Sequence, residues 1–283
     1  MRIINILLAY SPNIKQSWGL IIILILCQAA GSAASMIIKY AGVTTPEWDL
    51  ISGSVLGYAA LSLVVFRLGK SSDSPAQAGN QGFLGIPGLA PVLWFLLVPF
   101  TLSVSLAAEP LIMWIPTPEI IQQMFADVIK NNLPSFLLLV VIAPVCEEWL
   151  FRGIILKGIL TRYSPSKAIV WSSVMFGVFH MNLQQGLFAF CLALAIGWVY
   201  WRTRSLWYCI FMHAINNAKA FLDAFLFSDT QADVTIADIA GGYYIYAVAL
   251  VVCALSWIAI NKIISSGATA DKSDTRIQYH GTK

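Results

Sequence analysis

Long runs of apolar residues recur along the whole chain, and each is close to the roughly 20 residues that a helix needs to cross a membrane. Polar residues gather in short segments between these runs. The pattern predicts an all-α fold, namely a polytopic membrane bundle of about eight transmembrane helices. We expect these helices at residues 18–38, 50–66, 91–112, 134–155, 167–180, 186–200, 206–222 and 243–260.

Composition supports this prediction. Hydrophobic residues make up 58% of the 283 residues and charged residues only 11%, whereas soluble domains carry about 25% charged residues. We expect a single membrane domain over residues 1–264 and a polar, disordered cytoplasmic tail over 265–283. Between the expected helices, residues 67–81 have the composition of a linker, and residues 116–132 favour an amphipathic helix at the membrane interface.

The positive charges predict the orientation. With the amino terminus inside, thirteen of the seventeen Lys and Arg residues fall on the inner side, three on the outer side, and Arg152 within the membrane. This asymmetry predicts cytoplasmic termini, in the cell (inner) membrane of a prokaryote. It also accounts for the net charge of +3, and no basic and aromatic surface suited to nucleic acid is present.

Three ionisable residues interrupt the fourth apolar run. Glu147, Glu148 and Arg152 lie in the stretch Cys-Glu-Glu-Trp-Leu-Phe-Arg at residues 146–152. A charged side chain at bilayer depth costs at least about 2.5 to 3.5 kcal/mol, so such residues indicate a function and require partners. This stretch is the first candidate for a functional site within a polar intramembrane cavity.

The spacing separates the two glutamates. Glu148 and Arg152 are four residues apart with the acid first, which favours an ion pair on one helix face, and this leaves Glu147 free to face a cavity. Pro144 removes the amide that would bond the carbonyl of Val140 in an α-helix, so the helix can open near the glutamates. Alternatively, the three charges form a polar cluster that only locks helices together.

Two histidines in later apolar runs repeat the four-residue spacing. Phe176 shares a helix face with His180, and His213 shares one with Asn217. A lone membrane histidine is more often a satisfied core residue, but the chain has only three, and the third, His280, lies in the tail. At about 1.5 Å per residue, Glu147 and both histidines lie at similar depths and can converge.

In this order on three predicted helices, these motifs resemble those of the CPBP family, also called the ABI family, of CAAX proteases and bacteriocin-processing proteins. The resemblance covers about residues 133–222. It implies an intramembrane glutamic endopeptidase that hydrolyses a peptide bond of a membrane-associated or lipidated substrate. In such a peptidase, Glu147 and His180 activate a water molecule, and His213 and Asn217 stabilise the oxyanion. Glu148, Arg152 and Phe176 have supporting roles.

Two alternatives remain open. In a zinc-dependent variant, Glu147, His180 and His213 are the metal ligands, although the HExxH pattern of many zinc peptidases is absent. We prefer the version without a cofactor. In the other alternative the protein is not catalytic, and serves as an immunity or scaffold protein or as a small transporter that relays protons. The expected partners are the lipid bilayer and a peptide or protein substrate that enters from the membrane or the cytoplasmic side.

Overall fold

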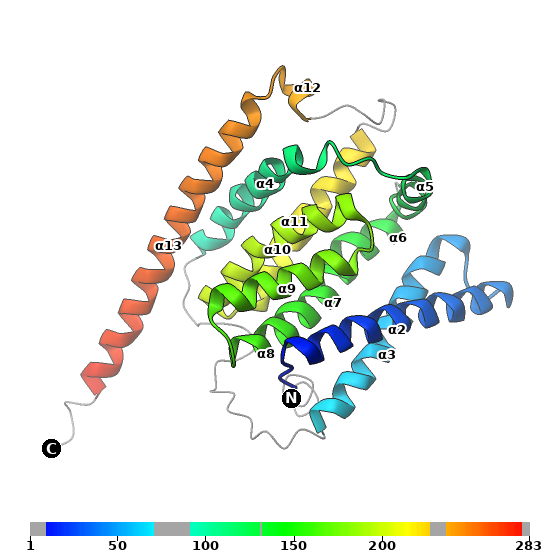
Figure 1. Cartoon of the computed structure of the whole chain (residues 1–283), viewed down its shortest axis with the longest axis horizontal. Coiled ribbons are helices and arrows are strands. Elements are labelled where there is room, and N and C mark those ends of the chain that lie inside the picture. The colour runs from blue at the N-terminus through cyan, green and yellow to red at the C-terminus, as the bar shows by residue number, and fades with distance from the viewer. Residues whose placement is uncertain (1–9, 71–90, 131, 227–235, 279–283) are drawn as a thin grey trace.

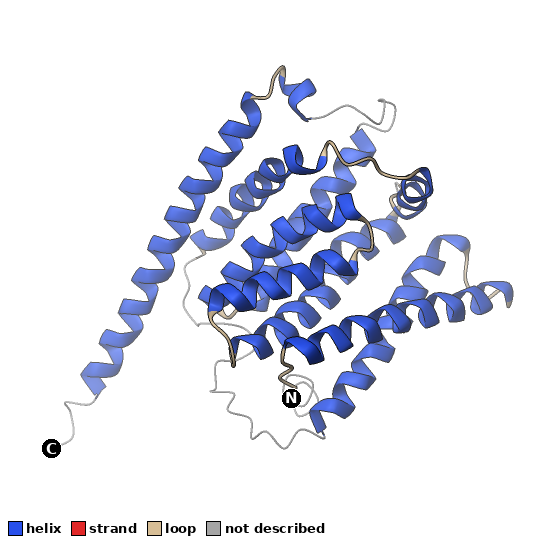
Figure 2. Ribbon diagram, viewed as in Figure 1, coloured by secondary structure: helices blue, strands red, loops and turns tan. Residues whose placement is uncertain are grey.

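The computed structural model describes residues 10–70, 91–130, 132–226 and 236–278. These residues are almost entirely helical and contain no strand (Figure 2). The predicted all-α, polytopic bundle is confirmed. Its long helices are α2 (Ile14–Tyr40), α3 (Pro46–Lys70), α4 (Val92–Ile112), α9 (Pro165–Phe179), α10 (Leu183–Thr203), α11 (Leu206–Leu226) and α13 (Tyr244–Gln278).

A further long segment carries the two glutamates and is called the glutamate helix here. It runs over Leu133–Leu160 and changes its hydrogen-bond register along its length. Three α-helical pieces alternate with two π-helical pieces. In chain order these are α6 (Leu133–Phe136), η1 (Leu137–Ile142), α7 (Ala143–Leu150), η2 (Phe151–Leu156) and α8 (Lys157–Leu160).

Six described helices are long and apolar enough to cross a membrane. They are α2, α3, α4, the glutamate helix, α10 and α13. Each expected transmembrane helix has a counterpart in the fold, but α9 has only 15 residues, or about 22 Å, against a hydrocarbon core of about 30 Å. The other exception, α11, carries the polar residues His213, Asn216 and Asn217. The count of eight membrane crossings therefore stays a prediction.

The bundle surrounds the glutamate helix (Figure 1). The hairpin of α2 and α3 packs on one side, and α3 contacts α6 and η1. On the opposite side α13 packs against α4, which in turn contacts α10 and α11. The helices α9, α10 and α11 occupy the middle together with the glutamate helix. The most central helices are thus those that carry the polar motifs.

Some boundaries differ from the expected ones. The helix α3 extends to Lys70, so the expected linker does not begin at residue 67, and residues 71–81 lie outside the described part. The helix α13 continues past Ser265 to Gln278, into the segment expected to be a disordered tail. Polar composition makes a segment soluble but does not end a helix, and this segment has no proline. The expected amphipathic helix corresponds to α5 (Glu119–Val128).

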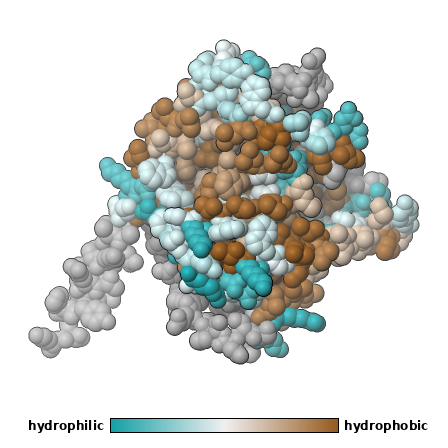
Figure 3. Space-filling model, viewed as in Figure 1, coloured by the Kyte–Doolittle hydropathy of each residue, from teal (hydrophilic) through white to brown (hydrophobic). Residues whose placement is uncertain are grey.

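Apolar side chains lie both inside the bundle and on its surface. The buried core is formed by residues of α2, α3, α4, α7, η2, α8, α9, α10, α11 and α13. On the outside, Phe95, Leu250 and many other large apolar residues are exposed, and apolar residues cover much of the face shown in Figure 3. This distribution suits a molecule whose outer surface contacts lipid rather than water.

Glycines allow two helix pairs to approach closely near the polar centre. A Cβ atom at Gly31 of α2 would lie 2.6 Å from the backbone nitrogen of Gly57 in α3, too close for any side chain. A Cβ atom at Gly177 of α9 would lie 2.6 Å from the carbonyl oxygen of Gly186 in α10. These contacts set the positions of the neighbouring residues Tyr58 and Phe176.

Candidate active site

The glutamate helix changes register on both sides of Glu147 and Glu148, which lie on α7 between two π-helical pieces. In the first of them, η1, the amide of Ala143 bonds the carbonyl of Leu138, five residues earlier. The amide missing at Pro144 therefore leaves the carbonyl of Leu139 without its backbone donor. The prediction for Val140 assumed an α-helical register throughout, whereas the chain is π-helical up to Ala143.

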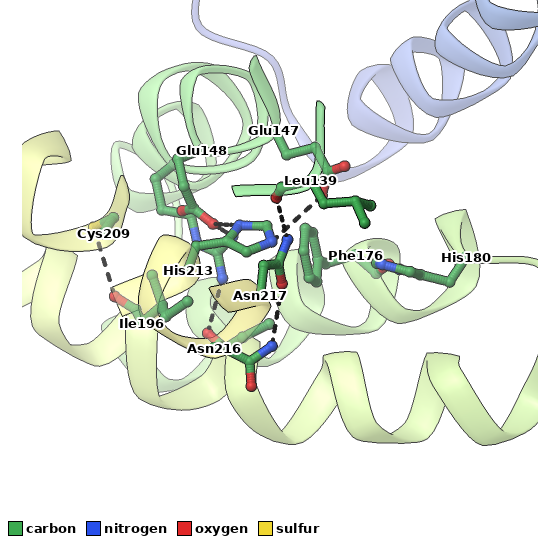
Figure 4. A network of polar contacts seen from close by, with 12 residues as sticks. Leu139, Glu147, Glu148, Phe176, His180, Ile196, Cys209, His213, Asn216 and Asn217 are labelled. Carbon is green, nitrogen blue, oxygen red and sulfur yellow. Dashed lines mark hydrogen bonds and ion pairs between the residues drawn. The ribbon is translucent and has the colours of Figure 1, made fainter. Parts of the chain in front are cut away.

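Glu148 is the centre of a buried ionic cluster (Figure 4). Its Oε1 atom lies 2.8 Å from Nη1 of Arg152 and 2.8 Å from Nδ1 of His213. Glu148 has no exposed surface, and Arg152 is only 1% exposed. Arg152 also donates from Nη2 to the carbonyl of Ala193 at 3.3 Å. The predicted pair of Glu148 and Arg152 is present and includes His213 of α11.

Glu147 points to a different set of neighbours. Its Oε1 atom accepts a hydrogen bond of 3.4 Å from the hydroxyl of Tyr58 in α3. Its Oε2 atom lies 3.9 Å from Nε2 of His213, which is too long for a hydrogen bond. This Oε2 atom is buried and has no hydrogen-bond partner within the described residues. A buried carboxylate oxygen without a partner is rare and calls for an explanation. Oε2 of Glu148 is also unpartnered, but Glu148 is fully enclosed in the ionic cluster, whereas Glu147 keeps 9% of its surface exposed and suits a catalytic or binding role.

His213 connects the two glutamates through its two ring nitrogens. Because an ionised carboxylate only accepts hydrogen bonds, the contact with Glu148 places a proton on Nδ1 of His213. The other nitrogen, Nε2, faces Glu147. It is an acceptor in the neutral ring and a donor in the imidazolium. The arrangement of carboxylate, imidazole and reacting group resembles that used by hydrolases to orient a histidine.

Phe176 separates His213 from His180, as Figure 4 shows. The ring of Phe176 lies 5.7 Å from that of His213 and 5.0 Å from that of His180, and the guanidinium of Arg152 lies over it at 4.9 Å. His180 ends α9, and its Nδ1 atom lies 2.8 Å from the carbonyl of Phe176. That contact makes Nδ1 the donor and leaves Nε2 for another partner.

Among the described residues, no hydrogen bond or ion pair joins His180 to either glutamate. Its hydrogen bond goes to Phe176, although the charge of Glu147 acts on it electrostatically. The structure therefore joins Glu147, Glu148, Arg152 and His213 directly, and brings His180 near them through Phe176.

Asn217 lies one turn after His213 on α11 and contacts the glutamate helix. Its Nδ2 atom donates to the carbonyl of Leu139 at 2.8 Å. Its Oδ1 atom accepts from Nδ2 of Asn216 at 3.2 Å, and Oδ1 of Asn216 accepts from the hydroxyl of Ser105 at 2.7 Å. One amide hydrogen of Asn217 thus has a protein partner, and the second is available to a ligand.

Four of these site residues were missed by the sequence motifs: Tyr58, Ser105, Leu139 and Asn216. Tyr58 and Ser105 lie on the first three long helices, where no motif singles them out. Leu139 takes part only through its backbone carbonyl. Asn216 is adjacent to a motif residue, so a search for polar neighbours of the motif residues on the same helix would have found it.

Glu147, His180 and His213 are the residues that would bind zinc in a zinc-dependent peptidase. Zinc requires three protein ligands at about 2.0 to 2.2 Å around one point. Within the described part of the chain, no three His, Cys, Asp or Glu side chains form such a group. The Nδ1 atoms of both histidines have protein partners, which is also how histidine ligands of metals are usually held, and His180 forms no metal-binding group with Glu147 and His213. The described residues therefore contain no preassembled three-ligand zinc site.

Comparison with known proteins agrees with the motifs. Residues 129–219 match the model of a family described as Type II CAAX prenyl endopeptidase Rce1-like. The matched segment includes every predicted site residue from Glu147 to Asn217, and the match agrees with the resemblance to the CPBP family. A Bacillus subtilis (strain 168) protein named "Putative membrane peptidase YdiL" is 25% identical over 211 residues, which cover 72% of this chain and 86% of that protein. No solved structure matches the chain.

Proposed function

We propose that the protein is an intramembrane endopeptidase that uses Glu147 to activate a water molecule. The observation that carries this proposal is the buried, unpartnered Oε2 atom of Glu147, held 3.9 Å from Nε2 of His213. The family match and the name of the Bacillus relative support the reaction class. The substrate class is a peptide that is membrane-associated or lipidated, as the family description indicates.

In the proposed reaction, Oε2 of Glu147 takes a proton from the water molecule, and the resulting hydroxide attacks the scissile carbonyl carbon. The bond to the leaving nitrogen then breaks, and Glu147 returns its proton to the departing amine. Tyr58 holds the other carboxylate oxygen, so that Oε2 is the atom that faces the water. His180 assists from its available Nε2 atom.

The negative oxygen of the tetrahedral intermediate requires donors. His213 supplies Nε2–H as an imidazolium, because its Nδ1–H is donated to Glu148. Asn217 supplies its second amide hydrogen. Two carboxylates, Arg152 and an imidazolium give the cluster no net charge, which lowers its cost within a membrane. A single donor to an oxyanion contributes roughly 2.7 to 4 kcal/mol.

A comparison of peptide termini in membranes tests the proposed function without knowledge of the substrate. Cells that contain the wild-type protein are compared with cells that contain Glu147→Gln at the same level. We expect a set of new protein termini that depends on Glu147. The exposed Glu119, on α5, provides the matched control, and Glu119→Gln should give the wild-type set.

The opposite result also identifies an alternative. If Glu147→Gln and wild-type cells have identical termini while the protein still performs its biological role, the peptidase proposal fails. An immunity or scaffold protein, or a proton-relaying transporter, would then explain the buried charges.

Metal removal is expected to leave the proposed activity intact. The structural reason is that Glu147, His180 and His213 are not gathered around one point. The measurement is the metal content of the purified active protein, together with its cleavage rate before and after exhaustive chelation. Stoichiometric zinc whose removal abolishes cleavage and whose return restores it would contradict this prediction.

Replacement of Tyr58 by phenylalanine is expected to lower kcat by about three- to tenfold, the value of one ordinary hydrogen bond, because this contact is long at 3.4 Å. KM should change little, because the hydroxyl contacts Glu147 rather than the substrate. The measurement is steady-state cleavage of a peptide found in the comparison of termini. Tyr200→Phe, another buried tyrosine, on α10, should leave kcat unchanged. An unaltered kcat in Tyr58→Phe would show that the 3.4 Å contact has no catalytic effect.

A further inference from the structure

We propose that Asn217 is a positioning residue that holds the glutamate helix in its π-helical register, by donating to the carbonyl that Pro144 leaves without a partner. Asn216 and Ser105 hold the amide of Asn217 for this contact. The effect on catalysis rests on the proposed function, whereas the effect on the helix does not.

The carbonyl of Leu139 lacks a backbone donor. In the register of η1, its backbone partner would be the amide of residue 144, which proline lacks. Leu139 is half-buried, and a carbonyl without a donor inside a membrane bundle is costly. Nδ2 of Asn217 supplies the hydrogen bond at 2.8 Å. The side chain of α11 thus replaces a backbone amide of another helix.

Hydrogen bonds to its neighbours determine which way the side-chain amide of Asn217 faces. Donors and acceptors follow one direction from Ser105 through Asn216 and Asn217 to Leu139. Asn216 and the Ser105 side chain are buried, and the Ser105 hydroxyl also lies 3.0 Å from the carbonyl of Thr101. The hydroxyl of Ser105 has a single proton to donate, so the fixed end of the chain is the carbonyl of Leu139, which can only accept. The nitrogen of Asn217 must therefore face Leu139, and its oxygen faces the amide of Asn216. The chain therefore fixes one of the two possible amide orientations.

The contact of Asn217 with Leu139 lies close to Glu147 along the glutamate helix. Leu139 precedes Glu147 by eight residues, or about two helical turns. One turn before Asn217, His213 bonds Glu148. The helix α11 thus contacts the glutamate helix at two residues, Leu139 and Glu148, which precede and follow Pro144 in the chain. Both contacts lie close to Glu147 (Figure 4). Two points fix the rotation and the height of Glu147 against His213. A displacement of about 1 Å at such a site can cost about a hundredfold in rate.

A second substitution can restore what the first removes. Asn217→Ala takes the donor from the carbonyl of Leu139, and Pro144→Ala provides a backbone amide for the same carbonyl. We expect Asn217→Ala to lower kcat, and the double variant Asn217→Ala/Pro144→Ala to regain about tenfold of that loss with little change in KM. The remaining loss measures the direct contact of Asn217 with the oxyanion. Pro144→Ala alone serves as the reference.

The control uses another helix proline. Pro99 lies inside α4, and Asn217→Ala/Pro99→Ala adds an amide that cannot reach Leu139, so it should not regain activity. Thermal unfolding in detergent provides a readout that needs no cleavage. Pro144→Ala should raise the midpoint of Asn217→Ala, or restore folded protein if that variant does not fold.

Two outcomes would overturn the inference: full kcat in Asn217→Ala, or a double variant that regains neither kcat nor stability. If the wild-type protein cleaves nothing but the stability is regained, the proposed function fails and the inference about the helix stands.

Discussion

Replacement of Glu147 by glutamine is expected to lower kcat/KM by about 10² to 10⁴, the usual contribution of a general base. Glutamine has nearly the same shape and can still accept the hydrogen bond from Tyr58, but it cannot take a proton from water. The measurement is steady-state cleavage by purified protein in liposomes. Most of the loss should appear in kcat, because the carboxylate acts on the water rather than on substrate binding.

Folding provides the control for this prediction. Oε2 of Glu147 has no hydrogen-bond partner to lose, and glutamine can keep the bond from Tyr58 at Oε1, so the protein should still fold and its thermal stability should change little. Glu119→Gln, on the exposed face of α5, should retain wild-type activity. If Glu147→Gln keeps wild-type kcat/KM, Glu147 is not the base, whatever the role of the other cluster residues.

Replacement of Arg152 by methionine is expected to be the most destabilising single change, at about 3 to 5 kcal/mol. Methionine is similar in length but leaves the buried charge of Glu148 with His213 as its only close partner. The measurement is the free energy of unfolding in a fixed detergent, from denaturant titration. The stacking of Arg152 on Phe176 is lost as well, which adds to the effect.

Two comparisons separate the buried pair from ion pairs in general. In α11, Lys219 and Asp223 have the same four-residue spacing but are each about one-third exposed, so Lys219→Met should cost at most about 1 kcal/mol. The neutral double variant Glu148→Gln/Arg152→Met should regain much of the stability lost in Arg152→Met. Equal destabilisation by Lys219→Met and Arg152→Met would contradict the assigned burial of the cluster.

The parts of the site that could be predicted from the sequence are those with a local cause. Glu148 and Arg152 pair because a helix brings residues four apart onto one face, and the two glutamates separate because adjacent residues point about 100° apart. The cost of charge within a membrane also singles out the correct helix. These arguments need no knowledge of how the helices pack.

The parts that could not be predicted depend on packing between helices. Tyr58 meets Glu147 from a helix 89 residues earlier in the chain, positioned by the glycine contact of α2 and α3. The sequence favours His180 as the partner of Glu147, whereas the structure places Tyr58 and His213 beside its two oxygens. The spacing of residues along a helix shows which helix face a residue lies on, but it does not show which residue of another helix contacts it.

The register of the glutamate helix is the other feature that sequence reasoning missed. A proline signals a missing amide, but the carbonyl that loses its partner depends on whether the turn is α-helical or π-helical. Composition does not distinguish the two registers. In the structure, η1 is π-helical up to Ala143, and the carbonyl that Asn217 reaches is that of Leu139.

The most direct test of water activation by Glu147 is a single turnover in water labelled with ¹⁸O. Purified protein in excess cleaves a substrate peptide once, and mass spectrometry locates the label in the product and in the peptide that contains Glu147. We predict one ¹⁸O atom in the new carboxylate of the product and none in Glu147, because the water attacks the substrate itself. Label in Glu147 and an unlabelled product would show attack by the carboxylate instead, and would contradict its role as a general base.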